Sequence, residues 1–339
     1  GLFRESNSLP NAFGPSIPTN VFYNWQDVWL ASSHKLPGRL GKKYDLLRFI
    51  LSARMYRSNY TSRPFRRSAD GAQTFIDRTY FLGSMGFANW NYYVDHSVYY
   101  LGQAEYFTRG LNGALILGFD YDEELQKRFY AGLQMEYGKH INKVGYYNIR
   151  ASYGGFTKKN TYQQILFRIE QNFYSHAIKL GPKFMMRQFI SVGVNLGFNR
   201  PLGKELVLNN SSGMRGLYTN YIRGTRNYVF NFETDVYPTF KVLGFTSSVF
   251  AFANLAITQQ GSMSEFELKQ GYGAGLRLRN LGLGIGSFEI MFAYYPGLGV
   301  PNMKPWTIAG GFENNRAVLP ENLFLPTILS AEGQPLLSD

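Results

Sequence analysis

Alternation with a period of two constrains this chain more than any other feature of its sequence. In residues 128–138, apolar side chains take every second position and glycine or polar side chains take the others (Phe129, Ala131, Leu133, Met135 and Tyr137 against Gly132, Gln134, Glu136 and Gly138). Because successive side chains of a β-strand point to opposite faces, this pattern predicts a strand whose two faces meet different environments.

Similar segments recur along most of the chain, separated by turns rich in Asp, Asn, Gly and Lys. We predict strands at 44–56, 79–93, 97–106, 111–121, 128–138, 145–153, 161–173 and 183–199, and five more at 226–237, 244–258, 271–280, 286–295 and 304–312. Residues 44–56 also fit a helical stripe, so a helix is an alternative there. The total is about 12 to 14 strands, which makes the expected fold all-β.

A transmembrane antiparallel β-barrel is the architecture that this pattern favours. Apolar faces recur on nearly every strand, and no helical segments are available to cover them. An unpaired backbone group in lipid costs several kcal/mol, so strands in a membrane must close on themselves. A membrane helix needs about 18 apolar residues, and the chain has no such run. A large soluble sandwich is the alternative, but it would have to hide Arg, Glu and Asn on its inner face.

The net charge of +12 would also suit a nucleic-acid-binding protein. The basic residues are spread along the chain, however, and several arginines take the polar positions of predicted strands (Arg48, Arg54, Arg150, Arg168, Arg277 and Arg279). We interpret them as the lining of a basic lumen, with further cations in loops that meet anionic lipid head groups. No nucleic-acid partner is expected.

The residues that carry most enzyme chemistry are few or poorly placed. The chain has no cysteine, and its four histidines have no metal-ligand spacing, so we expect no metal site and no cofactor. Asp95, His96 and Ser97 are the residue types of a hydrolytic triad, but adjacent residues on a strand or turn point apart. We therefore expect no catalytic residues and no enzyme activity.

Residues 211–297 carry four short motifs in order. A Gly-rich loop contains Met214-Arg215-Gly216-Leu217; Phe232-Glu233-Thr234, residues 249–254 and residues 271–279 follow on predicted strands. In this order and spacing they resemble the Omp85 superfamily, whose outer-membrane barrels insert or translocate proteins. The resemblance covers about a quarter of the chain well, and it implies a barrel of 16 strands in the outer membrane of a Gram-negative bacterium.

The resemblance also implies specific residues. Met214 to Leu217 match the motif of the family's sixth loop, which folds back into the lumen, and its arginine pairs with acids on the two strands that follow. Glu233 matches the first acid, whereas Asn254 stands where the second usually is. We expect an ion pair between Arg215 and Glu233, with Asn254 as a neutral hydrogen-bond partner of Arg215.

Three regions are expected along the chain. Residues 1–43 form an N-terminal segment that is periplasmic or interfacial, with a plug or a first strand as alternatives for 21–30; residues 44–312 form the barrel, and residues 313–339 form a periplasmic tail. The chain starts at Gly1 without Met or a signal peptide, so a signal was cleaved or the chain is part of a longer one. The receptor modules of the family are not visible before Tyr44.

The expected function is participation in protein insertion or translocation at the outer membrane. In the family the first and last strands pair weakly, and folding clients add strands to the exposed edge. The corresponding seam here contains Trp306, Ile308, Gly310, Gly311 and Phe312. Expected partners are outer-membrane lipids, barrel clients and periplasmic lipoproteins or surface proteins. The alternatives are a barrel that anchors or docks a partner complex, and a passive channel that prefers anions.

Overall fold

The computed structural model describes residues 2–8, 18–35, 45–63, 75–201, 204–219, 221–259, 266–283, 286–300, 303–311 and 325–329. Within these ranges the regular structure is β-strand, apart from the short 3-10 helices η1 (Asn210–Ser212) and η2 (Leu281–Leu283). No helix in this part of the chain has the length and apolarity that crossing a membrane requires. The expectation of an all-β chain is confirmed, and the helical alternative for residues 44–56 is wrong.

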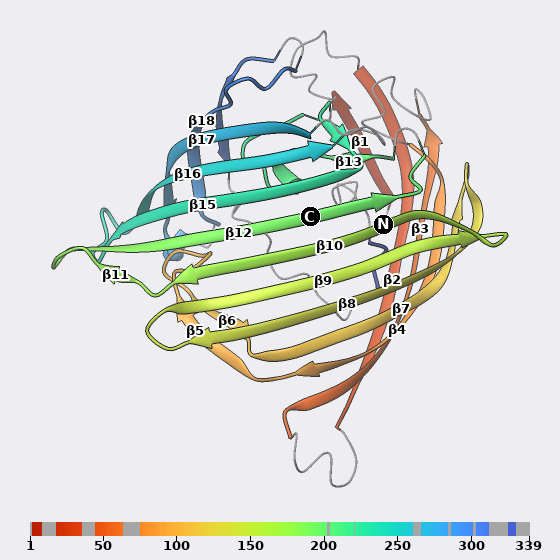
Figure 1. Cartoon of the computed structure of the whole chain (residues 1–339), viewed down its shortest axis with the longest axis horizontal. Helices are drawn as coiled ribbons and strands as arrows, with labels where there is room; N and C mark the ends of the chain where they lie inside the picture. Colours follow the sequence, from red (N-terminus) through yellow and green to blue (C-terminus); the bar gives the residue numbers. More distant parts are fainter. Residues whose placement is uncertain are drawn as a thin grey trace.

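One antiparallel sheet dominates the molecule (Figure 1). Its hydrogen-bonded path runs through β1 (Leu2–Ser8), β2 (Pro18–Lys35), β3 (Leu47–Ser62), β4 (Arg78–Asn89), β7 (Gly110–Asp122), β8 (Gln126–Ile141), β9 (Gly145–Lys158), β10 (Thr161–Ser175), β12 (Phe184–Phe198), β15 (Arg226–Pro238), β16 (Thr246–Gln259), β17 (Phe266–Arg279), β18 (Phe288–Tyr294) and β19 (Trp306–Gly311). These are fourteen strands, so the described residues do not reach the sixteen that the resemblance implies. The sheet is strongly curved and has an inner and an outer face.

Three small pieces of β structure accompany this sheet. β11 (Ile178–Lys179) pairs with β12, β13 (Leu206–Val207) pairs with β14 (Arg223–Gly224), and β5 (Tyr92–His96) pairs with β6 (Ala104–Thr108). The strands predicted at 79–93 and 97–106 are therefore partly wrong, because only β4 joins the large sheet. Val98 and Phe107 of the β5–β6 hairpin form a buried cluster with Tyr146 of β9 and Tyr174 of β10.

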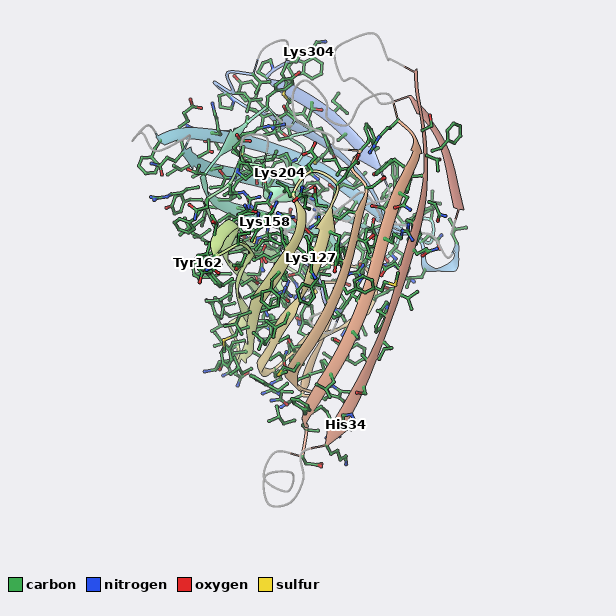
Figure 2. All side chains as sticks on the ribbon, turned by 90° about the vertical axis from the view of Figure 1, so that its right-hand side faces the viewer. His34, Lys127, Lys158, Tyr162, Lys204 and Lys304 are labelled. Atoms are coloured by element: carbon green, nitrogen blue, oxygen red, sulfur yellow. The ribbon has the colours of Figure 1, made fainter. Side chains whose placement is uncertain are left out.

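The two faces of the large sheet have opposite chemistry. On β8, Leu133 is 46% exposed, whereas Glu136 is 3% exposed. A similar alternation is found on β7, β16 and β18, where Phe, Leu, Tyr and Ile side chains are exposed; charged residues such as Arg277 and Glu289 are buried on the opposite face. Figure 2 shows the side chains projecting from both faces of the strands. A water-soluble sheet buries its apolar face, so this distribution is compatible with a membrane around the outer face.

The sheet begins earlier in the chain than the sequence suggested. β2 forms a long antiparallel ladder with β3, and Asp27 accepts hydrogen bonds from Nε and Nη2 of Arg54 at 2.8 and 2.6 Å. The first-strand alternative for residues 21–30 agrees with β2, so the large sheet includes residues ahead of position 44, where the barrel was expected to begin. The alternation of β2 is hard to read in the sequence, because consecutive residues Val28, Trp29 and Leu30 are all exposed.

The expected seam lies on the last strand of the path. β19 pairs with β18 from Trp306 to Gly311, and among the described residues no second strand pairs with β19. Trp306 and Ile308 are exposed, whereas Phe312 lies outside the described residues. β1 is the other end of the path and pairs with β2.

Candidate functional site

The candidate site is built on the connection from β12 to β15, which contains β13, η1 and β14. Asn209 caps η1 by accepting a hydrogen bond from the Ser212 backbone nitrogen, and Gly213 ends it with a φ of 107°. The side-chain oxygen of Asn210 then accepts a hydrogen bond from the Gly216 nitrogen at 2.8 Å. These local hydrogen bonds give the connection, hereafter the Arg215 loop, a fixed shape of its own.

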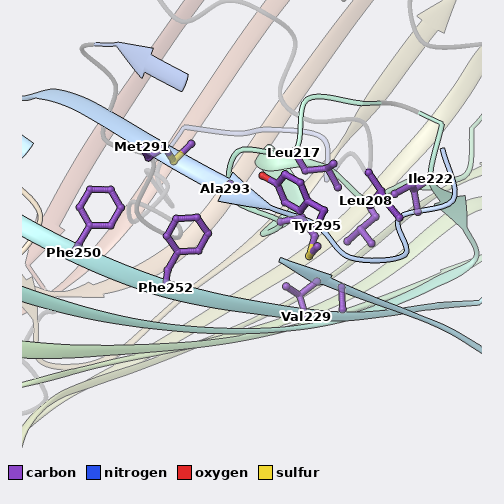
Figure 3. Close-up of a cluster of buried hydrophobic side chains, with 12 residues drawn as sticks. Leu208, Leu217, Ile222, Val229, Phe250, Phe252, Met291, Ala293 and Tyr295 are labelled. Carbon is purple, nitrogen blue, oxygen red and sulfur yellow. The ribbon is translucent and has the colours of Figure 1, made fainter. Parts of the chain in front are cut away.

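Apolar side chains fix the Arg215 loop to the inner face of the sheet. Met214 and Leu217 are fully buried in a cluster with Met291 and Ala293 of β18 and with Tyr295. Figure 3 shows Leu217 beside Tyr295, with Phe250 and Phe252 farther along the same face. The four motif residues therefore have different roles, because Met214 and Leu217 pack in the cluster, Gly216 lies close against it, and Arg215 carries the charge.

Gly216 is required by its surroundings. Its φ is +75°, and a Cβ atom there would lie 2.7 Å from the Tyr295 hydroxyl and 2.9 Å from Cε of Met291. That hydroxyl donates a 2.6 Å hydrogen bond to the carbonyl oxygen of Arg215. A side chain at position 216 would displace the group that holds the backbone of Arg215.

The Arg215 guanidinium lies between two carboxylates. Its Nη1 contacts Glu233 of β15, and its Nη2 contacts both oxygens of Glu289 of β18 at 3.0 and 2.9 Å. All three side chains are buried. Charge-assisted contacts of this kind are short, strong and directional, so the arginine fixes the loop to two strands at once.

Arg277 of β17 completes the network. It contacts Glu289 through Nε at 2.7 Å, and its Nη1 lies 3.0 Å from Glu233 and 3.0 Å from Asp235. The five side chains carry two positive and three negative formal charges, a balance of 2 − 3 = −1. Removal of one member would leave a buried charge without its full set of partners.

Aromatic rings support both guanidinium groups. The Phe250 ring lies 3.8 Å from Cζ of Arg277 and 4.5 Å from Cζ of Arg215. Two glycines of β17 leave room for these rings, because a Cβ atom at Gly275 would lie 2.5 Å from the Phe250 ring and one at Gly273 would lie 2.4 Å from the Phe252 ring. The alternating glycines that mark β17 in the sequence thus make space on its inner face.

The structure brings together only part of the predicted constellation. Glu233 contacts Arg215, as the sequence predicts. The hydrogen bond predicted between Asn254 and Arg215 is not found among the described residues, where Arg215 donates to carboxylates. The buried side-chain nitrogen of Asn254 has no hydrogen-bond partner there. Glu289 is the second acceptor instead. It lies on β18, which is separated from the strand of Glu233, β15, by β16 and β17. Its inward position in the 286–295 alternation was the available signal.

Other polar groups of the interior pair with one another. Asp95 accepts a 2.8 Å hydrogen bond from Arg187, so the side chain that the triad would need is bound elsewhere. The ring nitrogens of His140 and His176 lie 3.3 Å apart, a proximity that sequence spacing did not reveal. Within the described ranges, no group of three His, Asp or Glu side chains is placed to hold a metal ion.

Comparisons with known proteins add no identification. No protein-family model matches the chain, and no curated protein matches it. A function is therefore inferred from the Arg215 loop, its carboxylates and the chemistry of the two faces of the sheet.

Proposed function

We propose that this chain is an Omp85-type β-barrel of a Gram-negative outer membrane that takes part in the insertion or translocation of proteins. The outward apolar face of the fourteen-stranded sheet supports a lipid environment. Closure of the strands into a barrel belongs to the proposal, since lipid leaves no water to satisfy an open sheet edge. The proposal assigns the chain no catalysis, metal or cofactor.

The observation that carries the proposal is the fixed Arg215 loop. An Arg-Gly pair on a loop that lies against the inner face, with its guanidinium in contact with Glu233, agrees with what the family resemblance implies, whereas the contact with Glu289 is an addition to it. Five strands of the large sheet follow the loop, the number that the resemblance implies. A loop that is held by two buried carboxylates favours a structural role inside the proposed barrel over a role at the surface.

The last strand supports the expected seam. β19 has six residues and its partner β18 has seven, whereas β16 and β17 have 14 each. Gly310 and Gly311 lie at its end, and glycine weakens a strand. A short edge strand exposes unpaired backbone groups to which an incoming strand can add. Clients of the proposed activity are unfolded outer-membrane barrel proteins.

A passive anion channel is less well supported. Of the six inner arginines that predicted a basic lumen, four form ion pairs with acids: Arg54 with Asp27, Arg150 with Glu136, Arg168 with Glu170 and Arg277 with Asp235. Pairing reduces the positive potential that would select anions. The role of an anchor or docking platform remains the alternative, and it is separated from the proposal by experiment.

The test is insertion of an unfolded barrel client into liposomes that contain the purified protein. We expect the client to fold faster than in empty liposomes, as measured by its heat-modifiable migration in SDS gels. Arg215→Ala should lose at least half of the acceleration, because it frees the loop from both carboxylates. Lys127→Ala, at an exposed position near the start of β8, is the matched control and should keep it.

Two outcomes would contradict the proposal. Liposomes with the folded protein that fold the client no faster than empty ones would leave the anchor as the better function. A large ion conductance of the unmodified protein in planar bilayers would favour the channel, since a fixed lumen loop should keep conductance low until Arg215 is replaced.

A further inference from the structure

Residues 325–329 lie against the inner face of the large sheet, far along the chain from the strands that they contact. The carbonyl oxygen of Pro326 accepts a hydrogen bond from Nη1 of Arg54 on β3 at 3.3 Å. The backbone nitrogen of Leu329 donates one to the Tyr130 hydroxyl on β8 at 2.8 Å. This part of the expected tail therefore contacts the sheet, while the periplasmic location of residues 313–339 stays a prediction.

An apolar patch receives the segment on an otherwise polar face. The patch consists of five buried side chains from β4, β7, β8, β9 and β10 (Leu82, Ile116, Tyr130, Phe156 and Leu166). Ile328 packs against the first four, and Leu329 packs against Leu166. Inner positions elsewhere on these strands carry Asp120, Arg128, Gln134 and Glu136, so the patch is a local exception.

The shape of the patch is set by glycines in register. Ile116, Gly132, Gly154 and Leu166 are direct cross-strand partners from β7 to β10. A Cβ atom at Gly132 or Gly154 would lie 2.6 or 2.5 Å from the Tyr130 hydroxyl, so the tyrosine occupies the space that the glycines leave. Its hydroxyl is thereby presented to the Leu329 backbone, and a Cβ atom at Gly154 would lie 3.4 Å from Cβ of Leu329.

The recognition chemistry is that of peptide binding. The segment has no regular secondary structure and forms no strand of the sheet. The sheet holds its backbone by one donor and one acceptor side chain; Leu329 is buried and Ile328 is partly buried against it. Backbone hydrogen bonds give affinity without reading a sequence, whereas pockets for alternate side chains select apolar residues. Another extended, uncharged apolar segment would satisfy the same groups.

We propose that this apolar patch is a binding site for an extended apolar peptide segment of another chain, and that residues 325–329 are its occupant in cis. The site goes beyond the proposed function and does not depend on it, because binding needs neither a client nor a closed barrel. The cis occupant competes with a peptide in trans at the millimolar effective concentration that a covalent connection provides.

The first test measures binding of a fluorescent peptide of sequence LPTIL to the full-length protein in detergent. In Ile328→Asp/Leu329→Asp, two carboxylates replace the apolar side chains and should leave the patch open. We expect saturable binding of the peptide to this variant, at least tenfold tighter than to the unmodified protein. Adding Ile116→Ala should weaken binding at least fivefold. Adding Leu117→Ala, the next residue on β7 with an outward side chain, should not change it.

A second measurement does not need the cis segment to be damaged. The chain has no cysteine, so Leu329→Cys provides a single thiol whose labelling rate reports how often the segment leaves the patch. Excess LPTIL peptide should raise this rate severalfold, and a peptide with Asp at the last two positions should not. All variants are first checked for the heat-modifiable migration of the unmodified protein.

The proposal is overturned by either of two results. The first is the absence of saturable peptide binding to the folded Ile328→Asp/Leu329→Asp variant together with a labelling rate that the peptide does not change. The second is equal loss of binding with Ile116→Ala and Leu117→Ala, which would indicate nonspecific association with the outer face. Failure of the client-insertion assay would leave this proposal unaffected, since no client takes part in either measurement.

Discussion

The carboxylate of Glu289, like that of Glu233, is shared by two buried arginines. It contacts Nη2 of Arg215 and Nε of Arg277, so it joins the loop to the sheet and β17 to β18. A shared acid of this kind is more exposed to substitution than a simple pair, because its loss leaves two guanidinium groups with fewer partners at once.

Glu289→Gln should destabilise the protein by about 3 to 5 kcal/mol, the cost typical of breaking a buried ion pair on one side. The measurement is the urea midpoint in detergent. The control is Glu267→Gln, because Glu267 is half exposed and forms a 2.9 Å salt bridge with Lys269 near the start of β17. Because Glu267 is half exposed to solvent, its pair with the buried Lys269 should contribute about 1 kcal/mol or less, and equal effects of the two substitutions would contradict the role of Glu289.

Gly216→Ala should weaken the docking of the Arg215 loop for two reasons. The position has a positive φ, and the added methyl group would collide with the Tyr295 hydroxyl. Gly297→Ala is the matched control, since its φ is +62° and nothing lies within 4 Å of the position of a Cβ atom. We expect about 1 kcal/mol for the control and clearly more for Gly216→Ala, both measured by thermal unfolding.

The steric part of that difference can be isolated. Tyr295→Phe removes the hydroxyl and should recover part of the stability of Gly216→Ala, even though it loses the hydrogen bond to Arg215 when introduced alone. Strictly additive effects of the two substitutions would mean that the methyl group and the hydroxyl do not meet.

The sequence predicted residues of this site unevenly. A two-residue period assigns each side chain to a face, and by this rule Glu233, Arg277 and Glu289 all face inward. It does not say which inward groups meet, because that depends on register between strands. Asn254 has the expected face, yet it lies opposite Asn231 and Gly271 on the two neighbouring strands, and Arg215 donates to Glu233 and Glu289 instead.

At the scale of elements, the β5–β6 hairpin is tied to β12 by charge. Nη1 and Nη2 of Arg187 contact the Asp95 carboxylate at 2.8 and 3.3 Å. Burial alone would raise the pKa of Asp95, but the hydrogen bond and the charge of Arg187 outweigh it and lower the pKa below its usual value. The positive charge of a protonated His176 acts in the same direction.

The docking of this hairpin should depend on acid. Because the folded pKa lies below the unfolded one, the stabilisation is complete above the ordinary carboxyl pKa of about 3.9. It is lost as the pH falls through the lowered folded value. We expect pepsin to cleave within 97–107 at pH about 2 but not at pH about 4.

The matched variant for this prediction is Asp95→Asn, which should be cleaved at both pH values because it has no carboxylate to lose. Resistance of the unmodified protein at the lower pH, or identical behaviour of the two proteins, would show that the ion pair does not hold the hairpin.

The hairpin also shows what periodicity misses. Residues 79–106 are rich in Tyr, Phe and Trp throughout, and this composition predicts strands without saying in which sheet they lie. The turn around Asn89 and Asn91 separates β4 from β5, and the hairpin then packs inward against Tyr146 and Tyr174. Aromatic residues that line the outer face and those that fill the interior look alike in sequence.

At the scale of the whole molecule, the distribution of polarity predicts sensitivity to lipid. Leu133 lies at the middle of β8 and is 46% exposed on the outer face. Leu133→Arg should destabilise the protein in lipid bilayers by about 2 to 4 kcal/mol, the cost of an arginine at the midplane on a barrel. Unfolding by guanidinium chloride in vesicles measures the effect.

Leu243→Arg is the comparison, because Leu243 is 92% exposed in the turn between β15 and β16. It should change the stability by about 0.5 kcal/mol or less, as surface substitutions usually do. Similar small effects at both positions would mean that the outer face of β8 meets water.

Much of the large sheet was predictable, because a strand between two environments alternates apolar and polar residues. The five strands after the Arg215 loop were expected from 226 to 312, and β15 to β19 correspond to them. Residues 325–329 were not placed correctly, since a short apolar run with a proline gives no period and no direction. Its position follows from a tertiary contact with Tyr130, which no local pattern contains.

The charge network has a mechanical consequence for the end of the sheet. Its members come from the Arg215 loop, β15, β17 and β18, and β16 lies between β15 and β17. The network therefore stiffens the four consecutive strands β15 to β18, which form a plate together with the loop. None of its side chains belongs to β19. A force that pulls β19 away from β18 therefore acts mainly on the hydrogen-bonded ladder from Trp306 to Gly311. This ladder is the compliant hinge, while the plate of β15 to β18 keeps its shape.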